Sequence, residues 1–593
     1  MRRGLFAFCA ASLLLSVTVV ASAAAAPKQK QKDTLVQLLA INDFHGHIEP
    51  NTPGAIQIDQ TRNPTTGAVV NVTVPAGGVE YLSTWIKELR LTSPNTITVG
   101  SGDLIGASPL TSGLFHDEPT IEALNVVGID VSGIGNHEFD EGLDEVYRML
   151  NGGCHPVDGC QDGDPFFGSI FDYLAANVFF QGTEQTVLPP YEIHKVDNAK
   201  IAFIGLTLEG TPLIVTPSAI EGLEFRDEVQ TVNRLVTKLR NEQGVRAFVI
   251  LLHQGGFQNA PFSNAHDGLP GWPGINNCDN MSGEIVDIAN GLSDQVDVIV
   301  SGHTHAQYIC QGPTAIDGKV VTSAASFGRL VTDIDLVIDQ QTKDIKSATA
   351  RNVIVTQGVT KDPAASAVVE KYRAIAAPIA NRVVGSITAD LFSSRDGVSN
   401  PGGESPLGDV IADAQLEATA PTDFGAAVIA LMNPGGIRAP ILYSASPGGE
   451  APGEVTYGEI FAVQPFGNTL TVKTCTGAQI QHILDQQFDN PLPGQNRILQ
   501  VSHTLRYSWA NSRPAGDKVI DSTVMIEGAP AVAAQPYRVE MNSFLADGGD
   551  GFSVFRECTN QLGGEVDVEA LGRYFMAHSP ISPPTLDRIT RVD

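Results

Sequence analysis

The sequence predicts an α/β protein with two domains joined by a helix. A chain of 593 residues is too long for one hydrophobic core, since single cores stop growing at roughly 250–300 residues. Over the first half, short apolar runs alternate with segments of helical spacing, which is typical of a layered α/β domain. One long helical segment then separates this half from a second pattern of strands and helices.

The first domain is expected over residues 34–350. Short runs rich in β-branched residues predict buried strands, and apolar residues at helical spacing predict amphipathic helices. The predicted strands are Leu35–Ile41, Ile97–Val99, Ile201–Leu206, Ala247–Leu252 and Val296–Val300. The predicted helices are Gly78–Arg90, Thr120–Val127, Glu228–Gln243 and Gly283–Leu292. Phe257–Ser282 is rich in Asn, Gly and Pro, and we expect an ordered surface insertion near the functional site.

Residues 351–385 are expected to link the two domains. Within them, Asp362–Val384 is dominated by Ala, Glu, Lys and Arg and predicts one helix, in which Pro378 marks a potential kink. A second α/β domain is expected over residues 386–593.

The first 26 residues have the organisation of a signal peptide. Arg2 and Arg3 precede the apolar run Leu5–Val20, and Ala21–Ala23 offers small residues for cleavage. An N-terminal membrane anchor is the alternative, but the run is short for a spanning helix. No later run is long enough to span a bilayer, and the C-terminal residues lack the hydrophobic tail of a GPI signal. We expect a protein that is secreted, either extracellular or periplasmic.

The expected secretion predicts that the cysteines form disulfides, because disulfides persist in oxidising compartments. Six cysteines follow residue 26, and six allow fifteen pairings, among which the sequence cannot choose. The pairing we expect closes one short Gly/Asp loop and keeps the other bridges within domains: Cys154–Cys160, Cys278–Cys310 and Cys475–Cys558. Six free thiols are the alternative.

The formal net charge of −29 disfavours binding of intact nucleic acid, because nucleic-acid-binding proteins usually carry a basic patch. The same charge repels anionic ligands in general. A phosphate site in this chain must therefore supply its own local positive charge.

Five motifs in the first half place metal-competent side chains directly after predicted strands, whose ends converge on one sheet edge. Mixed oxygen and imidazole ligands suit Zn, Mn, Co or Fe better than Ca or Mg. The ligands exceed what one ion needs, so two divalent ions sharing a carboxylate are expected. The motifs are Asn42-Asp43-Phe44-His45-Gly46, Gly102-Asp103, Gly135-Asn136-His137-Glu138-Phe139-Asp140, Leu252-His253-Gln254 and Gly302-His303-Thr304-His305.

Each motif alone also has a purely structural interpretation; a lone His253, for example, is more often a core histidine. In their order, however, the motifs resemble the calcineurin-type metallophosphoesterases, whose pattern runs Asp-Xaa-His, Gly-Asp, Gly-Asn-His-Glu, His and Gly-His-Xaa-His. The resemblance implies the following ligands: Asp43, His45 and His305 for one ion, Asn136, His253 and His303 for the other, and Asp103 bridging both.

The same resemblance gives His137 a catalytic role without metal binding. His137 would stabilise the transferring phosphoryl group or protonate the leaving oxygen, and Asp140 would orient it. Catalysis would then consist of positioning and electrostatics, with no covalent intermediate.

Five motifs in the second half resemble the C-terminal domain of the 5′-nucleotidase family, which includes periplasmic UDP-sugar hydrolases and animal ecto-5′-nucleotidase. They are Glu404-Ser405-Pro406-Leu407-Gly408-Asp409, Asn433-Pro434-Gly435-Gly436-Ile437-Arg438, Thr456-Tyr457-Gly458-Glu459, Pro465-Phe466-Gly467-Asn468 and Phe544-Leu545-Ala546-Asp547-Gly548-Gly549-Asp550-Gly551-Phe552. The substrate-binding residues that follow are Asn433, Gly435, Gly436, Arg438, Phe466, Phe544 and Asp550.

These residue types fit a nucleotide. The glycines allow close approach of the backbone, and Arg438 offers a planar fork for phosphate. Phe466 and Phe544 could sandwich a base, and Asp550 could accept hydrogen bonds from ribose hydroxyls. Ordinary core packing and simple turns are the alternatives for the aromatic residues and the glycines.

One position departs from the family. Relatives often carry an arginine directly before the Glu-Ser segment, where this chain has Gly403. Arg395 could substitute if its loop brings it in.

The expected function is release of phosphate from nucleoside 5′-monophosphates, with di- and triphosphates as further candidates. The same site could instead hydrolyse 2′,3′-cyclic nucleotides or UDP-sugars, or a thiosulfate ester. A secreted nucleoside- or metal-binding protein is the non-enzymatic alternative. The resemblance also implies a hinge near Asp362–Val384 that moves substrate onto the metals.

Overall fold

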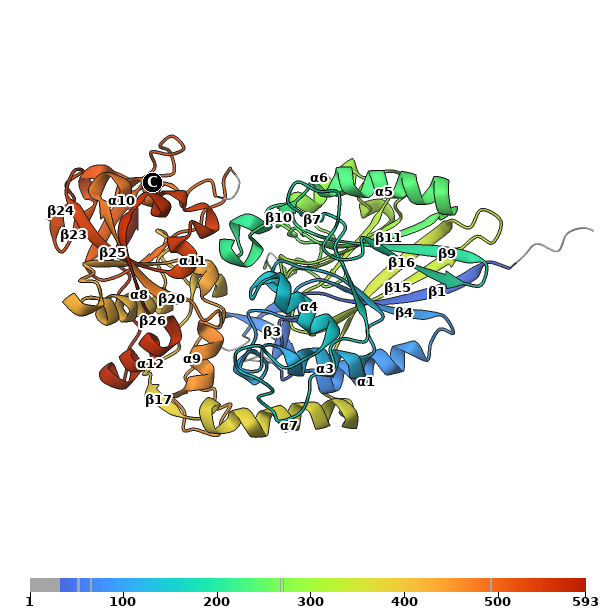
Figure 1. Cartoon of the computed structure of the whole chain (residues 1–593), viewed down its shortest axis with the longest axis horizontal. Coiled ribbons are helices and arrows are strands. Elements are labelled where there is room, and N and C mark those ends of the chain that lie inside the picture. The colour runs from blue at the N-terminus through green and yellow to red at the C-terminus, as the bar shows by residue number, and fades with distance from the viewer. Residues whose placement is uncertain (1–31, 51–53, 64–66, 267, 270, 491–492) are drawn as a thin grey trace, which may run out of the picture.

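The computed structural model of the chain describes residues 32–50, 54–63, 67–266, 268–269, 271–490 and 493–593. The expected signal peptide lies outside the described residues. The described residues form two α/β domains that lie side by side, with the C-terminal domain on the left of Figure 1. The predicted fold class is therefore confirmed.

The first domain contains two six-stranded sheets. The first sheet has, in spatial order, β16 (Ile345–Ile354), β15 (Leu330–Ile338), β1 (Thr34–Ile41), β4 (Thr96–Ser101), β5 (Val131–Gly133) and β6 (Asp172–Leu174). The second has β13 (Gln307–Cys310), β14 (Val320–Ala324), β12 (Val298–Ser301), β11 (Ala247–His253), β9 (Ala199–Thr207) and β8 (Tyr191–Val196). A small separate sheet pairs β7 (Val178–Phe180) with β10 (Leu223–Phe225).

The two sheets stack face to face between layers of helices. Buried apolar side chains of both sheets, including Leu38, Val99, Phe203 and Val249, form the core between them. In Figure 1 helices lie above and below the sheets. They are α5 (Glu228–Gln243) and α6 (Glu284–Gly291) on one side, and α1 (Val79–Arg90), α3 (Glu118–Val127) and α4 (Leu143–Asn151) on the other, with the one-turn helix α2 (Leu110–Gly113) near α3.

Parallel pairing decides where the strand ends lie. β1, β4, β5 and β6 run parallel in the first sheet, as do β9, β11, β12 and β14 in the second. The carboxyl ends of parallel strands lie at one edge of a sheet, and in Figure 1 β1 runs toward the second domain. The antiparallel edges β15–β16, β8 and β13 were not predicted.

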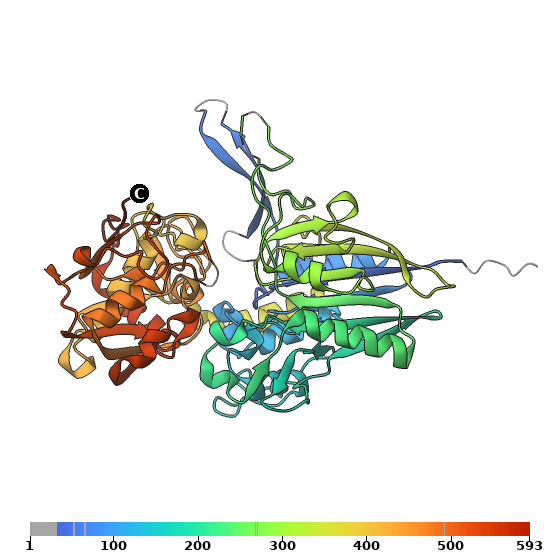
Figure 2. The ribbon, with the colours of Figure 1, turned by 90° about the horizontal axis from the view of Figure 1, so that it is seen from above.

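The insertion at residues 257–282 lies on the surface, as expected. It packs beside an unpredicted hairpin of β2 (Ala55–Arg62) and β3 (Val69–Pro75), and both project from the domain in Figure 2. Nε2 of His266 lies 2.9 Å from Oδ2 of Asp59 across this contact. The disulfide Cys278–Cys310 ties the insertion to β13.

The linker contains α7 (Pro363–Ala380), which lies along the first domain and ends at the second. The Asp362 side chain caps it by accepting hydrogen bonds from the backbone of Ala364 and Ala365 at 2.8 and 3.3 Å. The predicted helix extended too far, because Val383 already pairs with Thr456 in a strand. The predicted boundary between the first domain and the linker, at residue 350, falls within β16.

The second domain is built on a five-stranded sheet. Its strands are β21 (Gln500–Val501), β18 (Ile429–Met432), β25 (Pro536–Asn542), β20 (Thr469–Thr476) and β26 (Thr559–Val566). Smaller sheets pair β17 (Val383–Ser386) with β19 (Glu454–Thr456), and join β24 (Ala529–Pro530), β23 (Met525–Ile526), β22 (Leu505–Trp509) and β27 (Ile589–Arg591). Its helices are α8 (Pro406–Thr419), α9 (Tyr457–Val463), α10 (Gly477–Asp485), α11 (Ser543–Ala546) and α12 (Asp567–His578).

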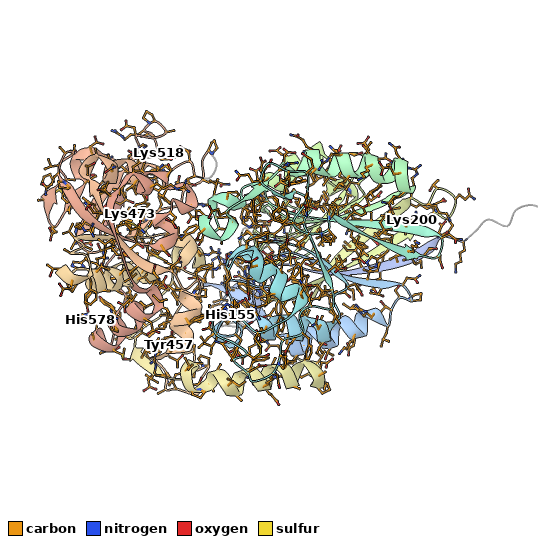
Figure 3. The ribbon with its side chains drawn as sticks, viewed as in Figure 1. His155, Lys200, Tyr457, Lys473, Lys518 and His578 are labelled. Atoms are coloured by element: carbon orange, nitrogen blue, oxygen red, sulfur yellow. A yellow bond between two sulfur atoms is a disulfide. The ribbon has the colours of Figure 1, made fainter. Side chains whose placement is uncertain are left out.

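Tyr457, the first residue of α9, lies where the linker enters the second domain (Figure 3). Its hydroxyl donates to Oε1 of Glu569 at 2.7 Å, and the guanidinium of Arg382 lies 4.8 Å from its ring centre. Arg382, two residues after α7, is therefore held against the second domain by this cation–π contact and by the backbone N–H of Tyr457, which donates to the Arg382 carbonyl oxygen at 2.8 Å.

The disulfides among the described residues are Cys154–Cys160, Cys278–Cys310 and Cys475–Cys558, which confirms the expected pairing. Among the described residues, no helix combines the length and apolar character needed to cross a membrane.

Two buried carboxyl groups in the second domain should make stability depend on pH. Burial raises the pKa of Glu540 on β25 well above its usual range, and burial raises the pKa of Asp567 to about 8. In the unfolded chain both groups ionise near pH 4. As pH rises from about 4 to 8, the unfolded state therefore loses protons that the native state keeps, and the free energy of unfolding should fall.

Urea unfolding of the whole chain across that pH range checks this. Glu540→Gln should flatten the decline, whereas Glu557→Gln, at an exposed position, should leave it unchanged. An identical decline in the wild type and Glu540→Gln would contradict the assignment.

Candidate functional site

The predicted metal ligands follow strands of both stacked sheets. Asp43, Asp103 and Asn136 follow β1, β4 and β5, which are neighbours in the first sheet. His253 ends β11 and His303 follows β12, which are neighbours in the second sheet. Because the sheets are stacked, five loops from two sheets meet in one place. Groups of these side chains lie close enough to share a cation: Asp43, His45 and His305; and Asp103, His253 and His303.

Several of these residues have a left-handed backbone. Their φ angles are 47° for Asp43, 48° for His45, 49° for Asp103, 69° for His303 and 56° for His305. Such conformations cost a non-glycine residue on the order of 1–3 kcal/mol and gather at functional sites, where the surrounding structure enforces them. The surrounding structure therefore holds these residues in strained backbone conformations that direct their side chains into the site.

His45 and His305 present nitrogen atoms to one point. Their Nε2 atoms are 3.1 Å apart, and Nε2 of His45 is 3.6 Å from Oδ2 of Asp103. Nδ1 of His45 lies 2.8 Å from the carbonyl oxygen of Gly106, which can only accept, so Nδ1 carries the hydrogen and Nε2 keeps its lone pair. Burial lowers the pKa of His45 well below its usual range, so the ring is neutral, as a metal ligand must be.

His253 presents a second ring nitrogen to the cluster. Its Nδ1 lies 2.8 Å from the carbonyl oxygen of Ser101, so Nδ1 carries a hydrogen and Nε2 is the nitrogen that faces Asp103. That buried Nε2 is 2.9 Å from Oδ2 of Asp103 but has no hydrogen-bond partner among the described residues. Burial lowers the pKa of His253 and Asp103 raises it, to about 9 overall, so a proton and a metal ion would compete for Nε2. The carboxylate of Asp103 and the imidazoles of His253 and His303 form a donor set that could hold a divalent cation.

Glu138 holds the central loops in place, a role that the sequence analysis missed. Its carboxylate accepts hydrogen bonds from the backbone of Asp103, Leu104 and Gly135, at 3.0, 2.8 and 2.6 Å. A Cβ at Gly135 would lie 2.2 Å from Oδ1 of Asp103, so only glycine fits there. The position of Glu138 within the Gly-Asn-His-Glu motif could have indicated this role.

His137 and Asp140 form a pair beside this cluster. Nδ1 of His137 lies 2.8 Å from Oδ2 of Asp140, and the backbone N–H of His137 donates to Oδ1 of Asp103 at 2.9 Å. Burial lowers the pKa of His137, but the carboxylates of Asp140 and Asp103 raise it to a net value above its usual range. The pairing of Nδ1 leaves Nε2 as the nitrogen available to a ligand.

One cavity of about 1710 Å³ runs from this cluster into the second domain. It is lined by Asp103, Asn136, His137, Asp140, His303 and His305 on one side and by Asn433, Gly435, Gly436, Arg438, Phe466, Phe544 and Asp550 on the other. Every predicted substrate-binding residue therefore lines the cavity that the predicted catalytic pair also lines.

Phe466 reaches across the domain interface. Its ring stacks on that of His137, with centroids 5.6 Å apart and an interplanar angle of 21°. The guanidinium of Arg438 lies 5.6 Å from the Phe466 ring centre. A Cβ at Gly549 would be 2.5 Å from the ring of Phe544, so the Gly-Gly-Asp segment packs directly on that ring.

Asp550 is held by two side chains. Oδ2 accepts a hydrogen bond from Nδ2 of Asn433 at 2.8 Å, and Oδ1 is ion-paired with Nη1 of Arg497. Arg497 was not predicted as a site residue, because it belongs to no motif of the family pattern and lies 53 residues from its partner.

Gly403 cannot be replaced by arginine without rearrangement. Its φ is +94°, and a Cβ would lie 2.7 Å from Cγ1 of Ile498. Arg395 lines the same cavity, so its loop does bring it to the site. Burial and, to a smaller extent, the charge of nearby Arg395 lower the pKa of Arg438 to about 9, which indicates that the two guanidinium groups lie close together.

Comparisons with known proteins agree with this architecture. Residues 36–307 match the family model for calcineurin-like phosphoesterases, and residues 383–557 match that for the 5′-nucleotidase C-terminal domain. The chain is 32% identical to cell wall protein Lmo0130 of Listeria monocytogenes, over 94% of this chain and 69% of that protein. It is 33% identical to endonuclease YhcR of Bacillus subtilis over 87% of this chain, but spans only 37% of that protein.

A solved structure has the same fold over both domains. It is a 5′-nucleotidase precursor from Thermus thermophilus, which superimposes with a TM-score of 0.72 over 94% of this chain and all of that chain, at 24% identity.

Proposed function

The chain belongs to the calcineurin-like phosphoesterases that carry a 5′-nucleotidase C-terminal domain, and on that premise we propose that it is a secreted two-metal 5′-nucleotidase. Members of this family hydrolyse phosphoesters. The observation that carries the substrate assignment is a cavity lined both by four of the predicted metal ligands and by Arg438, Phe466, Phe544 and Asp550.

Two divalent ions, with Zn, Mn, Co or Fe as the candidates, would be held by Asp43, His45, Asp103, His253, His303 and His305. Asn136 would be the remaining ligand, since its Oδ1 lies 3.1 Å from Nδ1 of His303. When bound, such ions supply Lewis acidity that activates water near neutral pH and neutralises phosphate charge.

The chain's own residues supply the remaining chemistry. Asp140 orients His137 through Nδ1, so that Nε2 can donate a proton to the leaving 5′-oxygen of the nucleoside. Arg438 and Arg395 provide local positive charge for the scissile phosphate in a chain whose net charge is −29.

The second domain would select the nucleoside. Phe466 and Phe544 offer aromatic faces for a base, and Asn433 and Asp550 offer polar groups to the ribose. Gly435 and Gly436 let the backbone approach the ligand. Hydrolysis of 2′,3′-cyclic nucleotides or UDP-sugars in the same cavity is the alternative. The name of endonuclease YhcR belongs to a protein that extends well beyond this chain, and the acidity of this chain argues against intact nucleic acid as substrate.

Secretion is supported by the N-terminal sequence pattern and by three disulfides, which persist in oxidising compartments.

Phosphate release from AMP tests the proposed function. The purified protein should release phosphate before chelation, lose that activity after chelation, and regain it with Mn²⁺ or Zn²⁺. Activity on a cyclic nucleotide or diester without activity on AMP would overturn the substrate assignment. Inactivity on every phosphoester would favour a binding protein instead.

Movement between the domains should be required for turnover. Residues Thr211–Leu213 of the first domain lie against Gly549–Gly551 of the second, the segment that contains Asp550. A reversible disulfide engineered between these segments should abolish steady-state AMP hydrolysis, since substrate entry and product release need the cavity to open. Activity should return on reduction, and a single-cysteine variant is the control. Full activity of the cross-linked protein would contradict a hinge near α7.

A further inference from the structure

The position of Arg497 points to a second phosphate subsite. We propose that Arg497 binds a phosphate group on the 2′- or 3′-oxygen of the ribose, so that the protein favours nucleoside 5′-phosphates that carry this additional phosphate. The inference rests on the proposed function, since it takes the metal cluster as the site of the 5′-phosphate and Asp550 as the residue beside the ribose.

Arg497 is built into the cavity wall. Its side chain is 24% exposed, and it lines the same cavity as Arg395, Arg438 and Asp550. A guanidinium has five N–H donors. In the part of the chain that the structure describes, its only side-chain hydrogen bond runs from Nη1 to Oδ1 of Asp550. Nε and Nη2 thus remain available to a ligand.

The charges around Asp550 do not suit neutral hydroxyl groups alone. The Asp550 carboxylate already accepts from Asn433 on one oxygen and from Arg497 on the other. Arg395 lines the same cavity and lies close enough to Asp550 and Arg497 for their charges to affect its pKa, but it is assigned to the scissile phosphate. The donors at the ribose end are therefore the N–H groups of Arg497 that Asp550 leaves unused, and an additional phosphate would accept hydrogen bonds from them.

The different positions of Arg438 and Arg497 in the cavity favour a phosphate on the ribose over a phosphate at the end of a polyphosphate. Arg438 influences the pKa of His45, His137 and His305, so it lies near the metal cluster. Arg497 instead pairs with Asp550, the predicted ribose contact. A guanidinium binds phosphate through two parallel charge-assisted hydrogen bonds, whereas it gains little from a neutral hydroxyl.

The test compares AMP, ADP and adenosine 3′,5′-bisphosphate as substrates of the full-length protein and of Arg497→Gln. The ratio of kcat/KM for the bisphosphate to that for AMP should fall about tenfold or more in the variant, and the corresponding ratio for ADP should stay the same. The first product of the bisphosphate should be adenosine 3′-monophosphate. Arg497→Lys keeps the charge without the fork and should give an intermediate ratio.

A binding measurement tests the role of Arg497 independently of catalysis. Calorimetry on the chelated protein should show tighter binding of the bisphosphate than of AMP, and Arg497→Gln should remove that difference. Arg506→Gln removes an arginine of β22 that pairs with Asp587, and it serves as the matched control. Thermal unfolding verifies that each variant is folded.

The outcomes are distinct. If the wild type hydrolyses AMP but Arg497→Gln changes the bisphosphate ratio by less than about twofold, the inference is wrong and the proposed function stands. If the variant loses ADP selectively, or if 5′-AMP is the first product, the ribose assignment is wrong. If AMP is not hydrolysed at all, the proposed function fails, and calorimetry alone decides the inference.

Discussion

Replacing Asp103 with asparagine is expected to lower kcat/KM for AMP by about a thousandfold or more, because the proposed metal pair would supply several kcal/mol of transition-state stabilisation. Asp103 is buried, and its Oδ2 lies 2.9 Å from Nε2 of His253 and 3.6 Å from Nε2 of His45. It thus offers one carboxylate to both halves of the histidine cluster. An amide of the same shape keeps the volume but loses the charge that two cations need.

Metal content is the direct readout. Asp103→Asn should retain less metal than the wild type after gel filtration, as measured by inductively coupled plasma mass spectrometry. Asp144→Asn, at an exposed position on α4, should retain the wild-type metal content and activity. Wild-type activity in Asp103→Asn would refute the bridging role.

Replacing His137 with asparagine is expected to lower kcat for AMP by about 10²–10⁴-fold, the range typical of a general acid. The metal content should stay unchanged, because His137 is not among the predicted ligands. Its Nδ1 is paired with Asp140, so the loss should reflect the proton that Nε2 delivers.

Two substrates with different leaving groups distinguish the loss of proton donation from a general disruption of the site. 4-Nitrophenolate leaves without protonation, so His137→Asn should lose much less activity on 4-nitrophenyl phosphate than on AMP. Asp140→Asn should have the same pattern with a smaller loss. Equal losses on both substrates would exclude the general-acid role and favour phosphoryl stabilisation.

Local sequence patterns were sufficient to predict much of the first domain. The helix predicted at Glu228–Gln243 is α5, and the strand predicted at Ala247–Leu252 lies within β11. Buried parallel strands consist of continuous β-branched runs, which stand out in a sequence. The antiparallel strand β16 was missed because its alternating exposure leaves only a weak apolar pattern. The stacking of two sheets, rather than a single open sheet, likewise has no local sequence pattern.

The candidate site likewise contains residues that could be predicted from the sequence and residues that could not. Residues placed by strand ends, such as Asp43 and Asp103, could be selected from the sequence, since the geometry of parallel sheets brings strand ends together. Arg497 could not be assigned, and Arg395 could be named only on condition that its loop brings it in, because both positions depend on how separate loops of the second domain pack at the cavity. Such contacts come from tertiary structure, not from local spacing.

The central claim is that two divalent ions, held mainly by these strand-end residues, make the chain a phosphatase for nucleoside 5′-monophosphates. Titration of the chelated protein with Mn²⁺ or Zn²⁺, with phosphate release from AMP followed at each step, tests it most directly. We predict that the chelated protein is inactive and that activity reaches its plateau at about two equivalents of bound metal. Full activity in the chelated protein, or a plateau at one equivalent, would contradict the two-metal account.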